Sequence, residues 1–308
     1  MAVALAKYAE LLMSTSAERN DVSEALISAS QLDASPALPT VADLWRRYQA
    51  LELPNKAPRT QKDNVAESKN LLLVFAKVAI DDLTPVDVRR YLDLRGATAR
   101  VRANREMALL SHMLNRAREW GMTEKPNPCQ GVRKHREQSR NRYVSDEEYL
   151  AVWRAGDQLV RDVMGLALLM GQRPQDLFGL RCADVTAEFV HVEIRKTQRR
   201  IRIENTGKLR AMVDELLARK RQPSQGALIV NQRGFDATAA MFKKRFELAR
   251  DKAGVTFQLR DLRAKNATDT DDLATAQKRL AHTSRSTTER YIRARKGDRV
   301  APLESDME

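Results

Sequence analysis

The chain has 308 residues, of which 43% are hydrophobic and 31% charged, and its 54 Lys and Arg against 41 Asp and Glu give a formal net charge of +13. The length predicts two domains, the apolar content excludes a disordered chain, and no apolar run approaches the ~18 residues of a membrane span. Two distant cysteines, Cys129 and Cys182, exclude a disulfide framework and a Cys-rich zinc site, and they are typical of a reducing compartment.

The charge is distributed unevenly along the chain. Residues 1–38 and 298–308 each carry a net charge of −3, so residues 39–297 carry +19. A basic interior of this size indicates a polyanionic partner, with nucleic acid as the first candidate, although an ordinary basic surface would give the same number. The start of the chain lacks a basic region followed by an apolar run and a cleavage site, so we do not expect secretion.

The N-terminal part of the chain has the pattern of a set of helices. We interpret residues 1–38 as a helical segment that serves as an arm for subunit contacts. Apolar periodicity and breaker residues then predict helices at 41–51, up to residue 75, at 85–94 with a stop before Gly96, and at 99–120. These helices form a compact four-helix unit in a domain that spans residues 39–132.

A basic segment follows at residues 133–143. Six of the ten residues from 133 to 142 are Arg, Lys or His, and none of the ten is apolar. Such a segment is typical of a linker, either solvated or laid across a phosphate backbone, and we favour the second in so basic a protein. Arg133, Lys134 and Arg140 are therefore candidate DNA-binding residues.

Residues 144–308 form a second predicted domain of mixed structure. Ser145 with Glu148 three residues later is typical of a helix start, and the apolar run at 160–170 predicts a buried helix. Alternating polarity at 189–194 and 201–203 predicts a small β-hairpin, and helices are expected at 209–220, at 238–253 and, with breaks, over 257–295. The expected fold is mainly α with a small β-sheet in this domain.

Several kinds of chemistry lack their signatures in the sequence. There is no GxxxxGK[ST] phosphate loop, no HExxH motif and no cluster of carboxylates that would hold Mg²⁺, and the four histidines are scattered. We therefore expect no metal site and no cofactor.

Cationic side chains do occur where a cation needs a partner. Arg173 follows the predicted buried helix, so it must pair either with Asp176 or with a bound phosphate. Arg260 and Arg263 stand at positions i and i+3 of a predicted helix, a spacing that suits bidentate contact with a phosphate.

Four short motifs around these cations resemble one family. They are QRPQDL at 172–177 with LR at 180–181, KT at 196–197 after a strand, DLR at 261–263, and LAHTS at 280–284 followed by STTERY at 286–291. They resemble the first arginine box, the β-hairpin lysine, the second arginine box and the tyrosine box of the tyrosine recombinases, in particular the phage-type integrases. One such box is a weak signal, but four in this order, with nine residues from His282 to Tyr291, are specific.

The resemblance, which covers residues 40–295, implies a helical core-binding domain and a mixed α/β tyrosine-recombinase catalytic domain. It implies that Tyr291 attacks a DNA phosphodiester to form a 3′-phosphotyrosyl bond and that Lys196 protonates the departing 5′-hydroxyl. The groups implied to stabilise charge on the phosphate are Arg173, Arg260, Arg263 and His282. The covalent link stores the bond energy, so the reaction needs neither ATP nor a metal.

The sequence departs from the family pattern at two places. The family usually has His, and sometimes Lys, three residues before the second arginine, and here that residue is Arg260. Arginine keeps a cation at the phosphate but stays protonated, so it supplies no base for the tyrosine proton. The segment between Arg263 and His282 is also a few residues shorter than usual.

The resemblance also implies the partners. Double-stranded DNA is the expected substrate, and the core-binding domain is expected to bind the side of the duplex opposite the catalytic domain. The longest helix of this domain begins with Arg100, Arg102 and Arg105, which are candidate DNA-binding residues. The alternative is that these three cations are only the solvated start of a helix. Self-association as a tetramer on DNA and accessory DNA-bending or directionality factors are further expectations, with no membrane partner. We expect a site-specific recombinase for DNA integration and excision, encoded by a phage or mobile element and acting in the cytoplasm of a bacterial host. The alternatives are a type IB topoisomerase-like enzyme that cuts and reseals one strand as a monomer, and a non-catalytic DNA-binding protein of the same fold.

Overall fold

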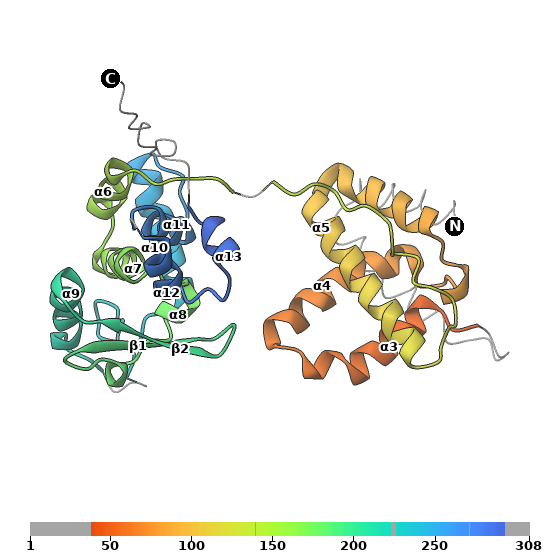
Figure 1. Cartoon of the computed structure of the whole chain (residues 1–308), viewed down its shortest axis with the longest axis horizontal. Coiled ribbons are helices and arrows are strands. Elements are labelled where there is room, and N and C mark those ends of the chain that lie inside the picture. The colour runs from red at the N-terminus through yellow and green to blue at the C-terminus, as the bar shows by residue number, and fades with distance from the viewer. Residues whose placement is uncertain (1–37, 139, 223–225, 271, 293–308) are drawn as a thin grey trace, which may run out of the picture. The chain divides into compact units, whose positions relative to one another are not determined.

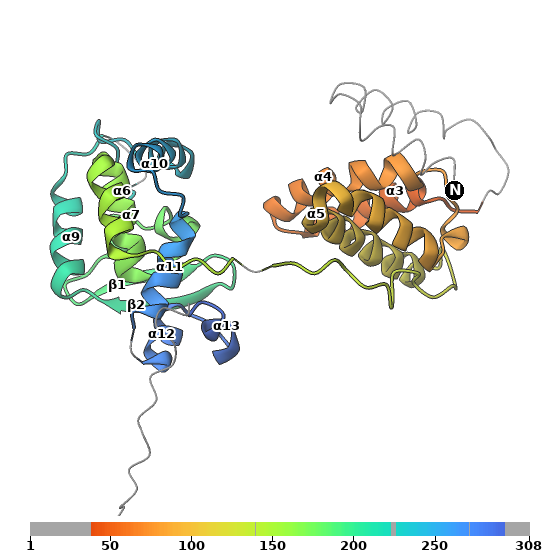
Figure 2. The same cartoon turned by 90° about the horizontal axis from the view of Figure 1, so that it is seen from above.

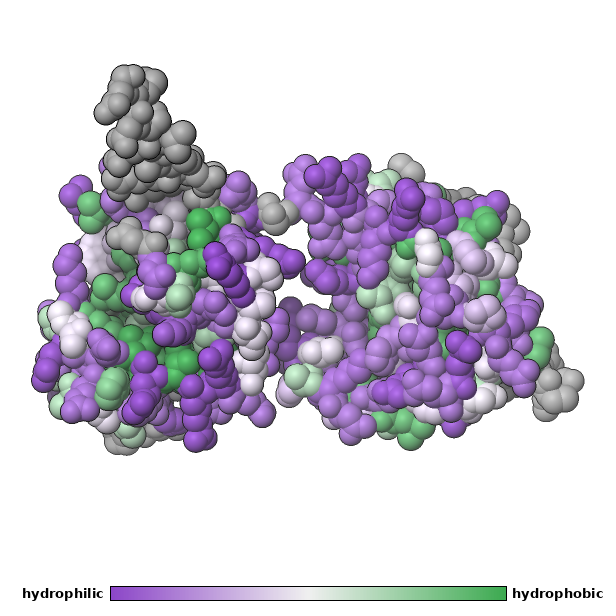
Figure 3. Space-filling model, in the orientation of Figure 1, coloured by the Kyte–Doolittle hydropathy of each residue, from purple (hydrophilic) through white to green (hydrophobic). Residues whose placement is uncertain are grey.

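The computed structural model describes residues 38–138, 140–222, 226–270 and 272–292, so the predicted N-terminal arm and the segment after residue 292 lie outside the described residues. The chain divides into two compact units, Met1–Ser139 and Arg140–Glu308, each with its own hydrophobic core (Figure 1). In the view of Figure 3 the surface of both units is mainly hydrophilic. Within the described part of the chain, no helix is long and apolar enough to cross a membrane.

The N-terminal unit consists of helices. They are α3 (Val41–Leu51), α4 (Pro58–Phe75) and α5 (Pro85–Glu119), joined by the 3-10 turns Leu53–Asn55 and Ile80–Asp82. Thr40 and Thr84 each cap a helix, and the carboxylate of the aspartate three residues later accepts a hydrogen bond from the backbone N of the cap residue. Tyr48, Phe75 and Tyr91 are fully or almost fully buried in the core that the three helices enclose.

Helix α5 consists of two helical stretches that meet at a kink, as the expected pair of helices implies, but the break lies later than predicted. The predicted stop at Gly96 is wrong, because Gly96 lies inside the helix and the kink falls at Ala99, whose φ of −152° and ψ of 67° are not helical. Gly96 serves a different purpose: the ring of His135 lies against it, and its Nε2 donates to Leu92 O at 2.8 Å. A Cβ atom on Gly96 would lie 2.1 Å from that Nε2, so the close approach requires glycine.

The first part of the basic segment is bound along α5. Asn104 Oδ1 accepts from the backbone N of His135 at 2.9 Å, and Asn104 Nδ2 donates to His135 O at 2.8 Å and to Glu137 Oε1 at 2.9 Å. Arg89 Nη1 donates to the carbonyl oxygen of Arg133 at 2.8 Å. The backbone from Arg133 to Glu137 is therefore part of the folded N-terminal unit.

The C-terminal unit combines helices with one hairpin. Its elements are α6 (Asp146–Ala155), α7 (Gln158–Met170), α8 (Pro174–Leu177), a 3-10 turn (Cys182–Asp184), β1 (Phe189–Ile194), β2 (Arg199–Glu204), α9 (Gly207–Ala218), α10 (Ala239–Ala253), α11 (Leu259–Thr268), α12 (Leu273–Arg279) and α13 (Arg285–Glu289). Strands β1 and β2 pair antiparallel, from Phe189 with Glu204 to Ile194 with Arg199, so the second strand begins two residues earlier than predicted. The almost wholly apolar α7 packs against α9 and α11, with α10 also in contact (Figure 2). The predicted fold class, mainly α with a small sheet, is confirmed.

Candidate active site

Arg263 lies at the centre of a buried cluster in the C-terminal unit. Its side chain is 2% exposed, although it belongs to a residue type that is rarely buried without partners. Nη1 donates to Gly171 O at 2.6 Å, and Nη2 donates to Leu280 O at 2.6 Å and to His282 Nε2 at 3.0 Å. Burial and the nearby Arg173 lower the pKa of Arg263 to about 10, so it remains a cation at neutral pH.

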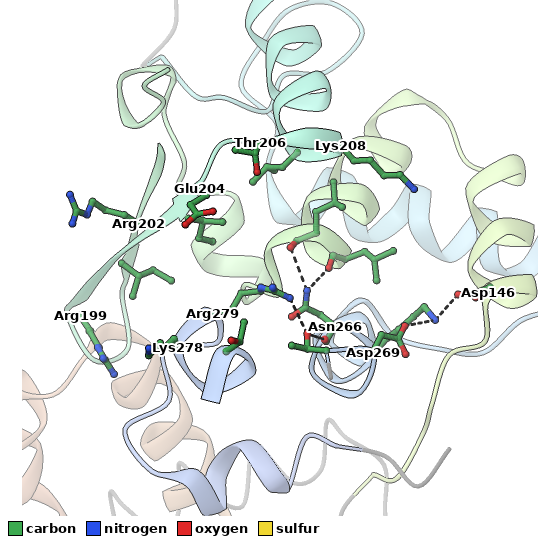
Figure 4. Close-up of a pocket in the computed structure, with 18 residues that line it drawn as sticks. Asp146, Arg199, Arg202, Glu204, Thr206, Lys208, Asn266, Asp269, Lys278 and Arg279 are labelled. Carbon is green, nitrogen blue, oxygen red and sulfur yellow. Dashed lines mark hydrogen bonds and ion pairs between the residues drawn. The ribbon is translucent and has the colours of Figure 1, made fainter. Parts of the chain in front are cut away.

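Contacts between α11 and α7 place the Arg263 partners. One turn after Arg263, Asn266 Nδ2 donates to Leu168 O at 2.7 Å, as the dashed lines in Figure 4 show. Gly171, the left-handed residue that ends α7, lies so close that a Cβ atom there would be 2.6 Å from Asn266 Oδ1. Both its φ of +66° and this approach favour glycine, and the carbonyl oxygen of Gly171 is thereby fixed toward Arg263.

His282 is buried between Arg263 and helix α13. It is 4% exposed, and its Nδ1 lies 3.0 Å from Thr288 Oγ1, whose residue is 0% exposed. Burial and the charges of Arg263 and Arg173 lower the pKa of His282 to about 4. At pH 7 the ring is therefore neutral.

Tyr291 stands just beyond α13 and beside both of these groups. Its backbone N donates to Thr288 O at 2.8 Å, and its ring is half-buried. The ring centroids of Tyr291 and His282 are 4.9 Å apart, and Arg263 Cζ lies 5.4 Å from the centroid of the tyrosine ring. The structure thus brings together three of the residues that the sequence motifs single out.

Arg173 lies near the Arg263 cluster and has a buried donor atom, Nη1, that is available to a ligand. It caps α8, and its Nη1 lies 3.9 Å from Asp176 Oδ2, which is an ion pair but too long for a hydrogen bond. Both of these buried atoms, and Arg263 Nε, lack a hydrogen-bond partner among the described residues. A buried donor without a partner is unfavourable by about 1–3 kcal/mol, so an anion is a natural ligand for these guanidinium groups.

Lys196 and Arg260 are not brought into contact with Tyr291. Lys196 is exposed in the turn between β1 and β2, and Arg260 is exposed on α11. Neither side chain has a hydrogen bond or ion pair within the described ranges. The expected fork of Arg260 and Arg263 is not formed, because Arg263 is directed into the core while Arg260 faces solvent.

The candidate DNA-binding residues fall into two groups. Those of the N-terminal unit are all exposed, and they are Arg100, Arg102, Arg105, Arg133 and Lys134. Among them, Arg105 forms an ion pair with Glu137, with Nη2 3.4 Å from Oε2. Arg140, in the C-terminal unit, instead binds Asp261, whose two carboxylate oxygens each lie 3.0 Å from its Nε.

A second set of contacts that sequence reasoning missed surrounds Lys265. This lysine is 2% exposed, and its Nζ lies 2.7 Å from Asp146 Oδ1 and 2.9 Å from Asp269 Oδ2 (Figure 4). Nζ also donates to Tyr143 Oη at 3.0 Å. Burial alone would lower the pKa of Lys265, but these three partners raise it. These contacts hold the chain near residue 143 and the start of α6 against α11. The only signal in the sequence that could have suggested them is the position of Lys265, two residues after Arg263.

A basic groove lies between β2 and the helices α11 and α12 (Figure 4). Its volume is about 860 Å³, and its lining includes the cations Arg199, Arg202, Lys208 and Lys278. Tyr291 and His282 are not among the lining residues, so the groove is separate from the Arg263 cluster.

Comparisons with known proteins agree with the motifs. The model of the phage integrase family matches residues 148–297. An integrase of Escherichia phage HK022 is 27% identical over 191 residues, a match that takes in 56% of this chain and 54% of the relative, so the chain spans about half the length of that curated relative.

Solved structures with the same fold include two integrases. Lambda integrase, in a tetramer bound to a Holliday junction, matches with a TM-score of 0.75 and 20% identity over 88% of this chain and 82% of that one. The Tn1549 transposon integrase, in complex with circular intermediate DNA, matches with a TM-score of 0.64 and 15% identity over 83% and 95% of the two chains. The fold of this chain is the one seen in these integrase structures. The family match assigns a phage integrase domain to residues 148–297, the part of the chain that holds the four motifs.

Proposed function

We propose that this protein is a site-specific DNA recombinase of the phage-integrase type, which cuts and rejoins strands through a 3′-phosphotyrosyl intermediate. One observation carries the proposal: a tyrosine lies beside a neutral histidine and a buried arginine, while Arg173 Nη1 and Arg263 Nε lack a hydrogen-bond partner among the described residues. This arrangement suits a phosphodiester that is attacked by Tyr291, because it joins a nucleophile to fixed cationic donors.

The residues have distinct roles in the proposed reaction. Tyr291 Oη attacks phosphorus, and negative charge gathers on the non-bridging oxygens, where Arg173 and Arg263 stabilise it. Removing one such donor typically raises the barrier by about 3–4 kcal/mol. Lys196, on an exposed hairpin turn, protonates the departing 5′-oxygen, and a 5′-hydroxyl of a partner strand later reverses the step. Arg260, which is exposed, is assigned to phosphate binding.

The proposed function assigns a role to each part of the chain. Residues 39–132 act as the core-binding domain and 144–308 as the catalytic domain. The basic segment 133–143 joins them, and its first part is held on α5. DNA contacts in the N-terminal unit come from its exposed cations, named above, and these contacts follow phosphates and make binding salt-sensitive. Lambda integrase, which shares this fold, forms a tetramer on a Holliday junction, and this supports assembly of the present protein as a tetramer on DNA. We also propose that it acts in the cytoplasm of a bacterial host, with accessory factors where they are needed.

A suicide substrate tests the proposal. The protein is incubated with nicked duplex DNA that carries its cognate site, and an SDS-resistant protein–DNA adduct is the expected product. Tyr291→Phe must abolish the adduct, whereas Tyr149→Phe, a tyrosine in α6 outside the cluster, must not. Absence of the adduct with the wild type, or an equal adduct with Tyr291→Phe, would refute the assignment.

Two alternatives are separated by the same material. A type IB topoisomerase-like enzyme would relax supercoiled DNA as a monomer and would not form a synapsed tetramer. A non-catalytic DNA-binding protein of this fold would retain binding and form no adduct at all. The nearness of Tyr291 to Arg263 and His282 favours the recombinase over a protein without catalysis.

A further inference from the structure

The two hydrogen bonds that the His282 ring makes with described residues define its protonation state. Arg263 Nη2 can only donate, so the His282 Nε2 that lies 3.0 Å from it must accept and cannot carry a proton. The ring proton is therefore on Nδ1, which donates to Thr288 Oγ1 at 3.0 Å. His282 is a neutral imidazole whose only lone pair is on the nitrogen that faces the Arg263 side of the cluster.

We propose that His282 Nε2 is the base that accepts the hydroxyl proton of Tyr291, and that Thr288 is a positioning residue that holds His282 in the required tautomer. This inference rests on the proposed function and adds to it the group that activates the nucleophile. Arg260, which takes the place of the residue expected to do this, is a permanent cation and is exposed.

Surrounding charges keep the lone pair of His282 available. The groups that face it are Arg263 on α11, Arg173 ahead of α8 and Tyr291 after α13. Two of the three are cations, and they oppose protonation of the ring before DNA binds. Charge that develops on the phosphate offsets this opposition, so the ring accepts a proton most readily when the phosphorane forms.

The proton and electron balance of the step is complete. The bond from Tyr291 Oη to phosphorus forms while the bond from phosphorus to the 5′-oxygen breaks. The hydroxyl proton of Tyr291 moves to His282 Nε2, and Lys196 supplies the proton of the leaving 5′-hydroxyl. The hydrogen bond that Arg263 Nη2 donates to His282 Nε2 is replaced by one to a phosphate oxygen. Thr288 Oγ1 continues to accept the hydrogen bond from His282 Nδ1, which keeps its proton. On rejoining, the imidazolium returns its proton to Tyr291.

Thr288 is well placed to connect base and nucleophile. Its hydroxyl oxygen contacts His282, and its carbonyl oxygen accepts from the backbone N of Tyr291 at 2.8 Å. It is fully buried in α13, a helix that begins at the cap residue Ser284, whose hydroxyl accepts from Thr287 N. One residue thus fixes both the ring orientation of His282 and the backbone of Tyr291.

The first experiment reads the tautomer and its consequence. Nitrogen-15 NMR of histidine-labelled protein at pH 7 should show His282 as the Nδ1–H tautomer in the wild type and in Thr288→Ser, and as a mixture in Thr288→Val. Single-turnover cleavage of the suicide substrate should be about 10- to 100-fold slower in Thr288→Val and within about 3-fold of wild type in Thr288→Ser, with DNA affinity unchanged in both. Thr287→Val is the matched control on the same helix. A protonated or Nε2–H ring in the wild type, or a Thr288→Val rate equal to that of Thr288→Ser, would overturn the inference.

The second experiment tests the base directly. Substituting 3-fluorotyrosine at position 291 lowers the pKa of the nucleophile, so cleavage by His282→Gln should recover several-fold while the wild type gains little. Arg173→Lys, which impairs charge stabilisation instead, should show no such recovery. An equal response of His282→Gln and wild type would refute the base role alone, whereas absence of an adduct with the wild type would refute the proposed function.

Discussion

Arg140 and Asp261 form a two-pronged ion pair, with Nε of the arginine 3.0 Å from each carboxylate oxygen. Asp261 is 4% exposed and also accepts from the backbone N of Gln258, the N-cap residue of α11, at 2.7 Å. It therefore stabilises the first turn of this helix, two residues before Arg263. The guanidinium group of Arg140, which the sequence predicts as a DNA contact, thus binds a carboxylate of the protein itself. Its position indicates that Arg140 braces the start of the helix that carries Arg263.

Removing either partner of this pair should slow DNA cleavage by a similar factor. We expect Arg140→Ala and Asp261→Asn each to reduce the single-turnover rate about 10-fold, and to lower the free energy of unfolding by about 1–2 kcal/mol because a buried polar group loses its partner. Because Arg140 is about a third exposed, solvent screening keeps the loss at this modest level.

The salt dependence of DNA binding distinguishes a brace from a phosphate contact. Loss of a phosphate contact reduces the slope of log K against log[salt] by about 1, and we expect this for the exposed Lys134→Ala but not for Arg140→Ala. A reduced slope in Arg140→Ala with an unchanged slope in Asp261→Asn would show that Arg140 binds DNA after all.

Lys196→Ala should affect the leaving group and nothing else. The variant should cleave an ordinary 5′-oxygen substrate at least 100-fold more slowly than wild type, because the departing oxygen loses its proton donor. A substrate with a 5′-thiol leaving group needs no such donor, and with it the two proteins should cleave at nearly the same rate. Equal slowing on both substrates would exclude the general-acid role.

Gly96→Ala should destabilise the N-terminal unit through His135. The added methyl group would occupy the space of the imidazole ring, and such overpacking typically lowers the free energy of unfolding by about 1–3 kcal/mol. The double variant with His135→Ala should be less destabilised than the sum of the two single variants, because the clash is removed. Additive losses in urea unfolding would contradict the proposed contact.

His282 should make stability depend on pH in the mildly acidic range. Its pKa falls from 6.5 to about 4 in the folded protein, so between these values the unfolded chain binds a proton that the folded chain does not. Stability is therefore greatest above pH 6.5 and falls as the pH approaches 4. The urea midpoint of His282→Gln should fall less between pH 7 and pH 4.5 than that of wild type, and parallel curves would contradict the shift.

Local signals were sufficient for part of the fold and the site. Thr84 and Ser145 predicted helix starts correctly because an N-cap acts on its own first turn. The motif residues Arg263, His282 and Tyr291 were selected by type and order, and they meet in the structure.

Contacts between distant segments escaped prediction. Thr288 and Asn266 look like ordinary helix residues, and their importance appears only when α13 and α11 are packed. The charge of its neighbours predicts that Arg140 binds DNA, whereas in the structure it pairs with Asp261, which is 121 positions away. Gly96 was read as a helix terminator because no local pattern reveals the ring of His135.

The hydrogen bonds that Asn104 and Arg89 make to the basic segment have a consequence for the entropy of DNA binding. Fixing the backbone of one residue is unfavourable by about 1–2 kcal/mol, and a loose basic tail would lose this freedom only when it met the duplex. Here Arg133 and His135 are already held by α5, so that ordering is completed when the protein folds. If this segment binds DNA as proposed, its cations meet the phosphates on a preorganised backbone, and more of their electrostatic attraction remains as binding free energy.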